Sequence, residues 1–162
     1  MPEPIEFRIM QSLQTALKSI NTVNGYHHTV NGFAVKLDPD HKVEDLIGGA
    51  NDPIGPPRPF IVLAPLPMEF NYEPANQLLM RMPFMIHAFH DSDPTDDNAK
   101  LATYHRLCAD VETALAADIT RGGLATDTII LTQQMRDHDG QFVEAQIPGQ
   151  VRYRRTYGAP NG

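Results

Sequence analysis

The chain closes on a long stretch of alternating sequence, FVEAQIPGQVRYRRTY, residues 142–157. Apolar side chains recur at every second position over much of this stretch, which is typical of a strand with one buried face. The segment from Thr128 to Arg136 also predicts a strand, and Asp139-Gly140 between the two is a hairpin signal. We therefore expect two long strands that pair at the C-terminus, with Pro148-Gly149 interrupting or bulging the second.

Three earlier segments also have the composition of strands. Alternation indicates an interrupted strand from Tyr26 to Leu37, and a central strand from Phe60 to Phe70 whose first half is apolar on both faces. A further strand is predicted from Gln77 to His90. Pro83 argues for an edge position or a bulge in it, because proline cannot donate a hydrogen bond to a neighbouring strand.

Two amphipathic helices are predicted, one before the strands and one between the third and the fourth. The first runs from Pro4 to Ile20, with apolar residues at three- and four-residue spacings. The second begins at Asp93-Pro94-Thr95-Asp96, which offers a side-chain cap and a proline for the first helical position, and it ends at Arg121-Gly122-Gly123. The order α-β-β-β-α-β-β predicts an α+β fold, with a mixed, mostly antiparallel five-stranded sheet and two helices packed on one face.

Length and composition indicate one domain that spans residues 1–162. A long flexible loop is expected at 38–59, which is rich in proline, glycine and acids, and a mobile tail is expected at 158–162. The formal net charge of −7 is the opposite of what non-specific nucleic-acid binding needs. Because the sequence has neither a secretory signal nor an apolar run of the ~20 residues that a membrane span requires, we expect no membrane partner.

The sequence contains none of the common phosphate-binding, nucleophile or zinc-binding motifs. The best candidates for catalysis are His87, His90 and Asp91, whose imidazoles and carboxylate could bind a divalent metal at the end of a strand. His87 and His90 are an odd number of residues apart, however, so on a strand they point to opposite faces. We therefore assign no catalytic, cofactor-binding or metal-binding residue.

The remaining reactive side chains favour structural roles. Cys108 is the only cysteine, which excludes an intrachain disulfide, and it lies on the apolar stripe of the second predicted helix. We expect it in the core, where a thiol behaves as a small hydrophobic group. The adjacent pair His27-His28 is expected on the surface, because neighbouring side chains diverge on a strand.

The closing strand concentrates basic residues among aromatic ones. Alternation places Arg152 and Arg154 on one face, and Tyr153 and Arg155 on the other. One interpretation is a solvated edge strand that its charges protect from aggregation. The other is a docking surface for an acidic patch, such as the loop from Asp38 to Asp52 of the next subunit. The candidate interface residues are Arg152, Arg154, Arg155, Asp38, Asp40, Glu44 and Asp45.

Read in order, the whole chain resembles the siphophage tail terminator family, also described as minor tail or tail completion proteins. The resemblance is carried by the opening helix and by five short stretches, which are Asn24-Gly25-Tyr26-His27, Pro59-Phe60-Ile61-Val62, Leu115-Ala116-Ala117-Asp118, Gly122-Gly123-Leu124 and Val151-Arg152-Tyr153-Arg154-Arg155. The family has no catalytic motif to transfer. The segment 48–59 is longer than the typical loop of the family.

The resemblance implies a structural protein of the virion that needs no cofactor. It implies a homo-oligomer, a hexameric ring that caps the tail tube, stops its polymerisation and provides the head-joining surface. The implied partners are the tail tube protein and a head-completion or neck protein, while DNA passes through the ring without specific binding. The implied location is the head-proximal end of the tail, with the host cytoplasm during assembly.

Two alternatives stay open at this point. One is a head–tail connector or neck protein of similar fold, which differs from a terminator in its partner. The other is a small metal-dependent enzyme centred on His87, His90 and Asp91, which differs in class.

Overall fold

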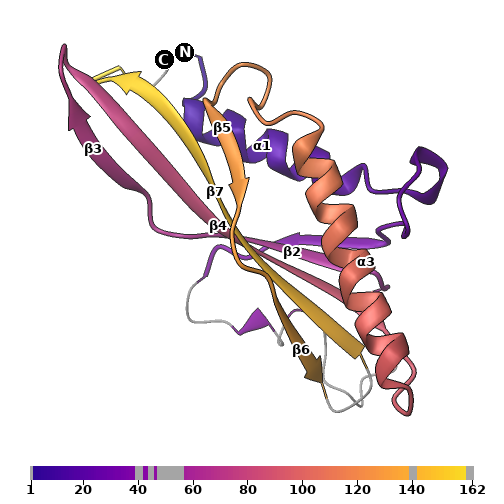
Figure 1. Cartoon of the computed structure of the whole chain (residues 1–162). Coiled ribbons are helices and arrows are strands. Elements are labelled where there is room, and N and C mark those ends of the chain that lie inside the picture. Colours follow the sequence, from indigo (N-terminus) through magenta and orange to yellow (C-terminus); the bar gives the residue numbers. More distant parts are fainter. Residues whose placement is uncertain (1, 39–41, 44–45, 47–56, 139–141, 160–162) are drawn as a thin grey trace.

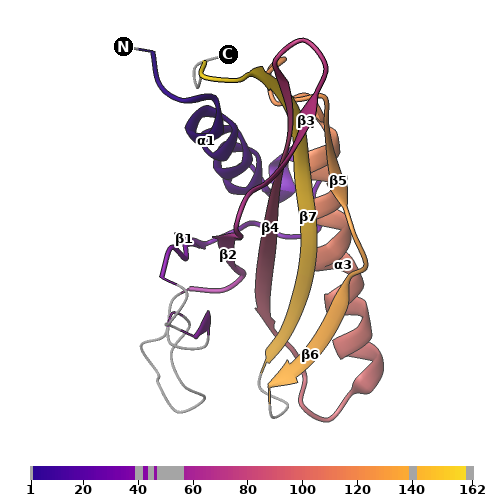
Figure 2. The same ribbon diagram turned by 90° about the vertical axis from the view of Figure 1, so that its left-hand side faces the viewer.

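Two long strands form the centre of the sheet in the computed structural model, which describes residues 2–38, 42–43, 46, 57–138 and 142–159. Strand β4 (Gln77–Asp91) pairs antiparallel with β7 (Phe142–Thr156) along all 15 residues of each. The two strands lie side by side over their full length (Figure 2). The long closing strand is thus confirmed, but the predicted interruption is wrong, since Pro148 and Gly149 stay in register with β4.

Each long strand carries two short strands along its outer edge. Strands β2 (Phe60–Pro65) and β3 (Glu69–Glu73) both pair with β4, while β5 (Asp127–Ile130) and β6 (Gln134–His138) both pair with β7. Strand β1 (Gly32–Val35) pairs with β2 in the parallel direction. The fold is α+β with a mixed sheet, but the described residues form seven strands and not five, because the segments predicted at 60–70 and 128–136 each break into two (Figure 1).

Both breaks lie opposite a proline of a long strand. The Leu66 N–H donates to the Pro83 carbonyl at 3.0 Å, and the Leu131 N–H donates to the Pro148 carbonyl at 2.8 Å. The nitrogen and the carbonyl of one strand residue point to the same side, so each proline nitrogen faces the break between two short strands. Because no strand residue faces the proline nitrogen at the break, the missing N–H of proline costs the sheet no hydrogen bond. Pro83 therefore lies inside a central strand without a bulge, contrary to the prediction of an edge or a bulge.

The first predicted helix is confirmed as α1 (Ile5–Lys18), which a short 3₁₀ turn, η1 (Thr22–Asn24), follows. The second is α3 (Asp97–Ala116), and its cap is Asp96, whose carboxylate accepts the N–H groups of the second and third helical residues. The helix therefore begins a few residues later than predicted. It also ends earlier than Arg121, because residues 117–124 form turns.

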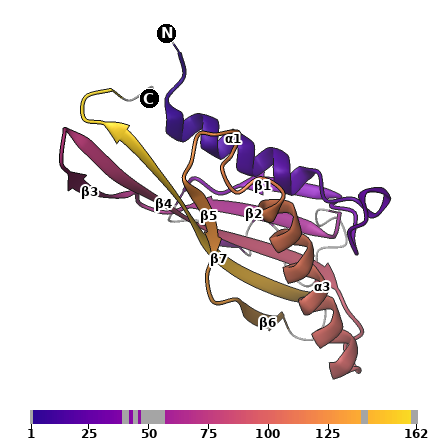
Figure 3. The same cartoon turned by 45° about the horizontal axis from the view of Figure 1, so that its top comes forward.

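Both helices pack against one face of the sheet (Figure 3). Ile9, Leu13 and Leu17 of α1 share one core with Cys108 and Val111 of α3. The sheet contributes alternate residues of β4, from Leu78 to Ala88, and of β7, from Ala145 to Tyr153. A smaller cluster covers the opposite face and consists of Phe60, Val62, Phe89 and Phe142.

The predicted strand from Tyr26 to Leu37 shortens to β1, because its first part is held as a loop by α3. The Asp110 carboxylate accepts the backbone N–H groups of His27 and His28 at 2.8 and 2.9 Å. Most of the predicted loop 38–59, and the end of the predicted tail 158–162, lie outside the residues that the structure describes. Within the described residues, no helix is long and apolar enough to cross a membrane.

Candidate assembly surface

Strand β3, with the parts of β4 and β7 beside it, projects beyond the helices (Figure 1), and we call this part of the sheet the arm. An exposed aromatic cluster lies on it. Phe70, Tyr72 and Tyr157 are 53%, 71% and 63% exposed, and Met68, two residues before Phe70, is half-exposed. The ring centroids of Phe70 and Tyr72 lie 5.6 Å apart, and those of Tyr72 and Tyr157 lie 6.0 Å apart. We call these four residues the arm surface. Apolar side chains grouped in this way mark a site of association more often than scattered ones do.

The arm surface lies on the helix-covered side of the sheet. Phe70 stands directly beside Met80 of β4, and Tyr72 stands beside Leu78. Directly paired residues of neighbouring strands share a face, and Met80 and Leu78 belong to the core under α1. The arm surface therefore continues the apolar face of the sheet past the end of the helical cover.

Strand β3 is also an edge of the sheet. It pairs with β4 on one side, and four of its five residues are exposed. Unpaired N–H and C=O groups along such an edge are a template for pairing with another chain. An edge strand with large exposed rings can therefore provide both backbone hydrogen bonds and apolar contact area to a partner.

Two arginines of the closing strand have acidic partners within the same chain. Arg152 forms a two-pronged ion pair with Asp127 of β5. Arg154 does the same with Glu73 of β3, at 2.8 and 3.4 Å. Each arginine lowers the pKa of its carboxyl partner, chiefly through its hydrogen bond. This strand therefore carries compensated charges, and it is not a surplus of positive charge facing solvent.

Arg155 and Tyr153 attach the arm to the first helix. The Tyr153 hydroxyl donates a 2.7 Å hydrogen bond to Oε1 of Glu6, and Arg155 Nε lies 3.4 Å from the same oxygen. Burial and the nearby Glu6 carboxylate raise the pKa of the Tyr153 hydroxyl. The shared partner agrees with the predicted common face of Tyr153 and Arg155.

The acidic half of the predicted interface stays a prediction. Asp38 is exposed, whereas Asp40, Glu44 and Asp45 lie outside the residues that the structure describes.

The histidines predicted as a possible metal site do not converge. His87 lies in the sheet next to Phe89, with stacked rings, while the ring of His90 packs edge-on against His28 with centroids 4.9 Å apart. Asp91 forms an ion pair with Arg58. His87 and His90 thus point to opposite faces, as predicted. Among the described residues, no group of three or more His, Cys, Asp or Glu side chains is arranged to hold a metal ion.

His87 instead belongs to a buried ionic cluster that the sequence did not reveal. Oε1 of Glu144 lies 2.6 Å from His87 Nδ1, Oε2 lies 2.6 Å from His138 Nε2, and Gln146 donates to Oε1 at 3.0 Å. Burial alone would raise the pKa of Glu144, but these hydrogen bonds outweigh it and hold the pKa at about 2. Glu144 accepts hydrogen bonds from several donors and is almost fully buried, so its role is to hold β4, β6 and β7 together.

Two other predictions for reactive side chains have different outcomes. Cys108 is buried in the core as predicted, and burial raises the pKa of its thiol. His28 is not a surface residue, because its ring is largely covered and its Nδ1 lies 2.8 Å from Asp110. His27 is exposed.

The arm surface was missed because one long strand was predicted across it. The signals that mark β3 as a separate edge strand are Pro67 before it and the turn Pro74-Ala75-Asn76 after it. No model of a known protein family matches the chain, and no curated protein matches it. A functional assignment therefore depends on the residues of the chain itself.

Proposed function

We propose that this chain is a structural protein that assembles through its arm surface, and that it acts as a siphophage tail terminator. In this role copies of the chain form a ring that caps the tail tube, stops its polymerisation and provides the head-joining surface. The observation that carries the proposal is the aromatic arm surface on β3, which pairs with β4 alone among the residues that the structure describes. The sequence resemblance supports the more specific role.

The size of the arm surface suits a subunit contact. A buried aromatic side chain contributes about 150–250 Å² of contact area, so the exposed parts of Phe70, Tyr72 and Tyr157 amount to roughly 400 Å². A stable interface needs about 800 Å² from each partner. Three side chains thus supply about half of one side of such an interface, and neighbouring backbone and side chains can supply the rest.

The charge of the chain supports a passive passage of DNA through the ring. The net charge of −7 repels phosphate groups, and two of the three closing arginines pair with Asp127 and Glu73. We therefore propose a hexamer that contacts the tail tube protein on one side and a head-completion or neck protein on the other, without specific DNA binding. Its place is the head-proximal end of the tail in the virion, after assembly in the host cytoplasm.

The test measures the mass of the purified chain in solution, alone and with tail tubes of the same phage. Native mass spectrometry should detect a ring of six copies, or a ring that forms on the tube end. The variant Tyr72→Asp should lose this assembly, whereas Val23→Asp, at an even more exposed position of η1, should keep it. A wild-type chain that stays monomeric and never binds tubes contradicts the proposal. Binding to the neck but not to the tube would indicate a connector of similar fold.

A further inference from the structure

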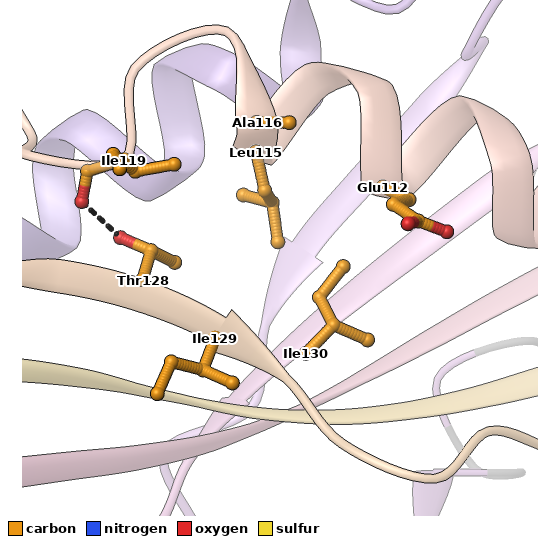
Figure 4. Close-up of a pocket in the computed structure, with 7 residues that line it drawn as sticks. All are labelled: Glu112, Leu115, Ala116, Ile119, Thr128, Ile129 and Ile130. Carbon is orange, nitrogen blue, oxygen red and sulfur yellow. Dashed lines mark hydrogen bonds between the residues drawn. The ribbon is translucent and has the colours of Figure 1, made fainter.

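A shallow apolar groove lies along the other free edge of the sheet, between α3 and β5 (Figure 4). It has a volume of about 260 Å³, and its lining is mainly apolar, with Leu115, Ala116, Ile119, Ile129 and Ile130 beside Thr128 and one charged residue, Glu112. Ile119 is half-exposed at its opening, and the Thr128 hydroxyl donates to the Ile119 carbonyl at 2.9 Å. This contact holds the turn after α3 against β5, so the groove has a defined shape.

The directions of the strands allow the two free edges to pair between copies. Where Arg81 of β4 pairs with Arg152 of β7, β3 lies on the outer side of β4 and β5 on the outer side of β7, and every neighbouring pair is antiparallel. Strand β3 therefore runs opposite to β5. When a second copy adds its β3 beside β5 of the first, in a head-to-tail arrangement, the antiparallel alternation continues across the junction.

The faces of the two edges match as well. Phe70 and Tyr72 point to the helix-covered side of the sheet, as their pairing with core residues of β4 shows. Ile130 packs against the same core, and Thr128 shares its side because it lies two residues away on β5. An incoming β3 that continues the sheet therefore places its two rings on the side where the groove opens.

We infer that the occupant of the groove is the β3 edge of a second copy of this chain, with Phe70 and Tyr72 seated against Ile119 and Ile130. This inference rests on the proposed function and names the surface that receives the arm. The exposed parts of Phe70 and Tyr72 amount to roughly 250 Å² and favour an apolar receptor, and the groove is a mainly apolar depression on the same side of the sheet. Two different patches that fit each other head to tail generate a ring when the rotation between copies closes.

The test uses one variant on each side of the contact. Tyr72→Asp disables the donor edge and keeps the groove, while Ile119→Asp disables the groove and keeps the donor edge. Each variant alone should self-associate at least about 30-fold more weakly than the wild type, which is the size of effect expected at the centre of an interface. An equimolar mixture should form dimers, because it contains one intact donor and one intact groove. Val23→Asp is the matched control, and circular dichroism confirms that each variant is folded.

The outcomes separate this inference from the proposed function. If wild-type rings form and Ile119→Asp assembles as well as wild type, the groove is not the receptor, although the chain still assembles. A mixture that yields only monomers also overturns the head-to-tail contact. A wild-type chain that is monomeric with and without tubes overturns both proposals.

A cross-linking variant provides a second readout that does not depend on weakening the contact. Tyr72→Cys combined with Ile119→Cys should give covalent multimers on mild oxidation, because the two positions meet between copies. The single variants should give no ladder of multimers, and a double variant that stays monomeric on a non-reducing gel contradicts the inference.

Discussion

Replacing Glu144 with glutamine removes one negative charge from the buried cluster of Glu144, His87 and His138 and leaves its shape nearly unchanged. The carboxylate lies 2.6 Å from a ring nitrogen of each histidine. A glutamine side chain has one carbonyl oxygen, so it can accept from only one of them. We expect the variant to fold with a lower free energy of unfolding.

The magnitude follows from the pKa of Glu144, which falls from 4.5 to about 2 in the folded chain. Each unit corresponds to about 1.4 kcal/mol, so the charged carboxylate stabilises the fold by about 3 kcal/mol when fully ionised. Because the folded-state pKa is the lower one, this stabilisation is present above pH 4.5 and is lost as the pH falls toward 2. The difference between wild type and Glu144→Gln should therefore shrink by about 2 kcal/mol between about pH 5 and pH 3.

Urea unfolding of both chains at the two pH values measures this change. The difference between the two chains is the informative quantity, because other carboxylates that titrate in this range affect both equally. Glu3→Gln is the control, since Glu3 is exposed ahead of α1 and its replacement should change stability by less than about 0.5 kcal/mol. A difference between wild type and Glu144→Gln that is the same at both pH values would refute this account of the cluster.

Two further substitutions and one chemical modification test other parts of the fold. Gly149→Ala should lower the free energy of unfolding by about 1–3 kcal/mol in thermal melts, because the added methyl group would overlap the ring of Phe84; an unchanged melting temperature would contradict this packing. Cys108 should react with iodoacetamide at least ~10-fold more slowly in the native chain than in urea, since burial covers the thiol and raises its pKa. Arg154→Glu should lower the melting temperature by placing a like charge beside Glu73, and the loss should be smaller in about 1 M salt than in about 50 mM salt.

Local patterns predicted the elements that depend on periodicity alone. The spacing of Ile9, Leu13 and Leu17 predicted α1, and alternation predicted the long closing strand. The predicted strand from Phe60 to Phe70 was wrong because alternation continues across residues 66–68, while the backbone there leaves the ladder. Where a strand breaks depends on the partner beside it, and here Pro83 of β4 has no N–H to offer at that point.

The candidate site shows the same division between local pattern and distant contact. Alternation indicated which face Arg155 and Tyr153 share, but the acid that meets them, Glu6, comes from the other end of the chain. No local sequence pattern indicated a role for Glu144, because its partner His87 lies 57 residues away.

By itself, the sequence determined the α+β class, the amphipathic helices, the buried position of Cys108 and the opposite faces of His87 and His90. These properties follow from the 3.6- and 2-residue periods of the backbone, which relate near neighbours in the chain. Only the tertiary structure decided that the closing arginines are paired within the chain and that β3 and the groove beside β5 form opposite free edges of one sheet. Strand pairing brings together residues that are far apart in sequence, and periodicity specifies the face of a side chain but not the partner that it meets.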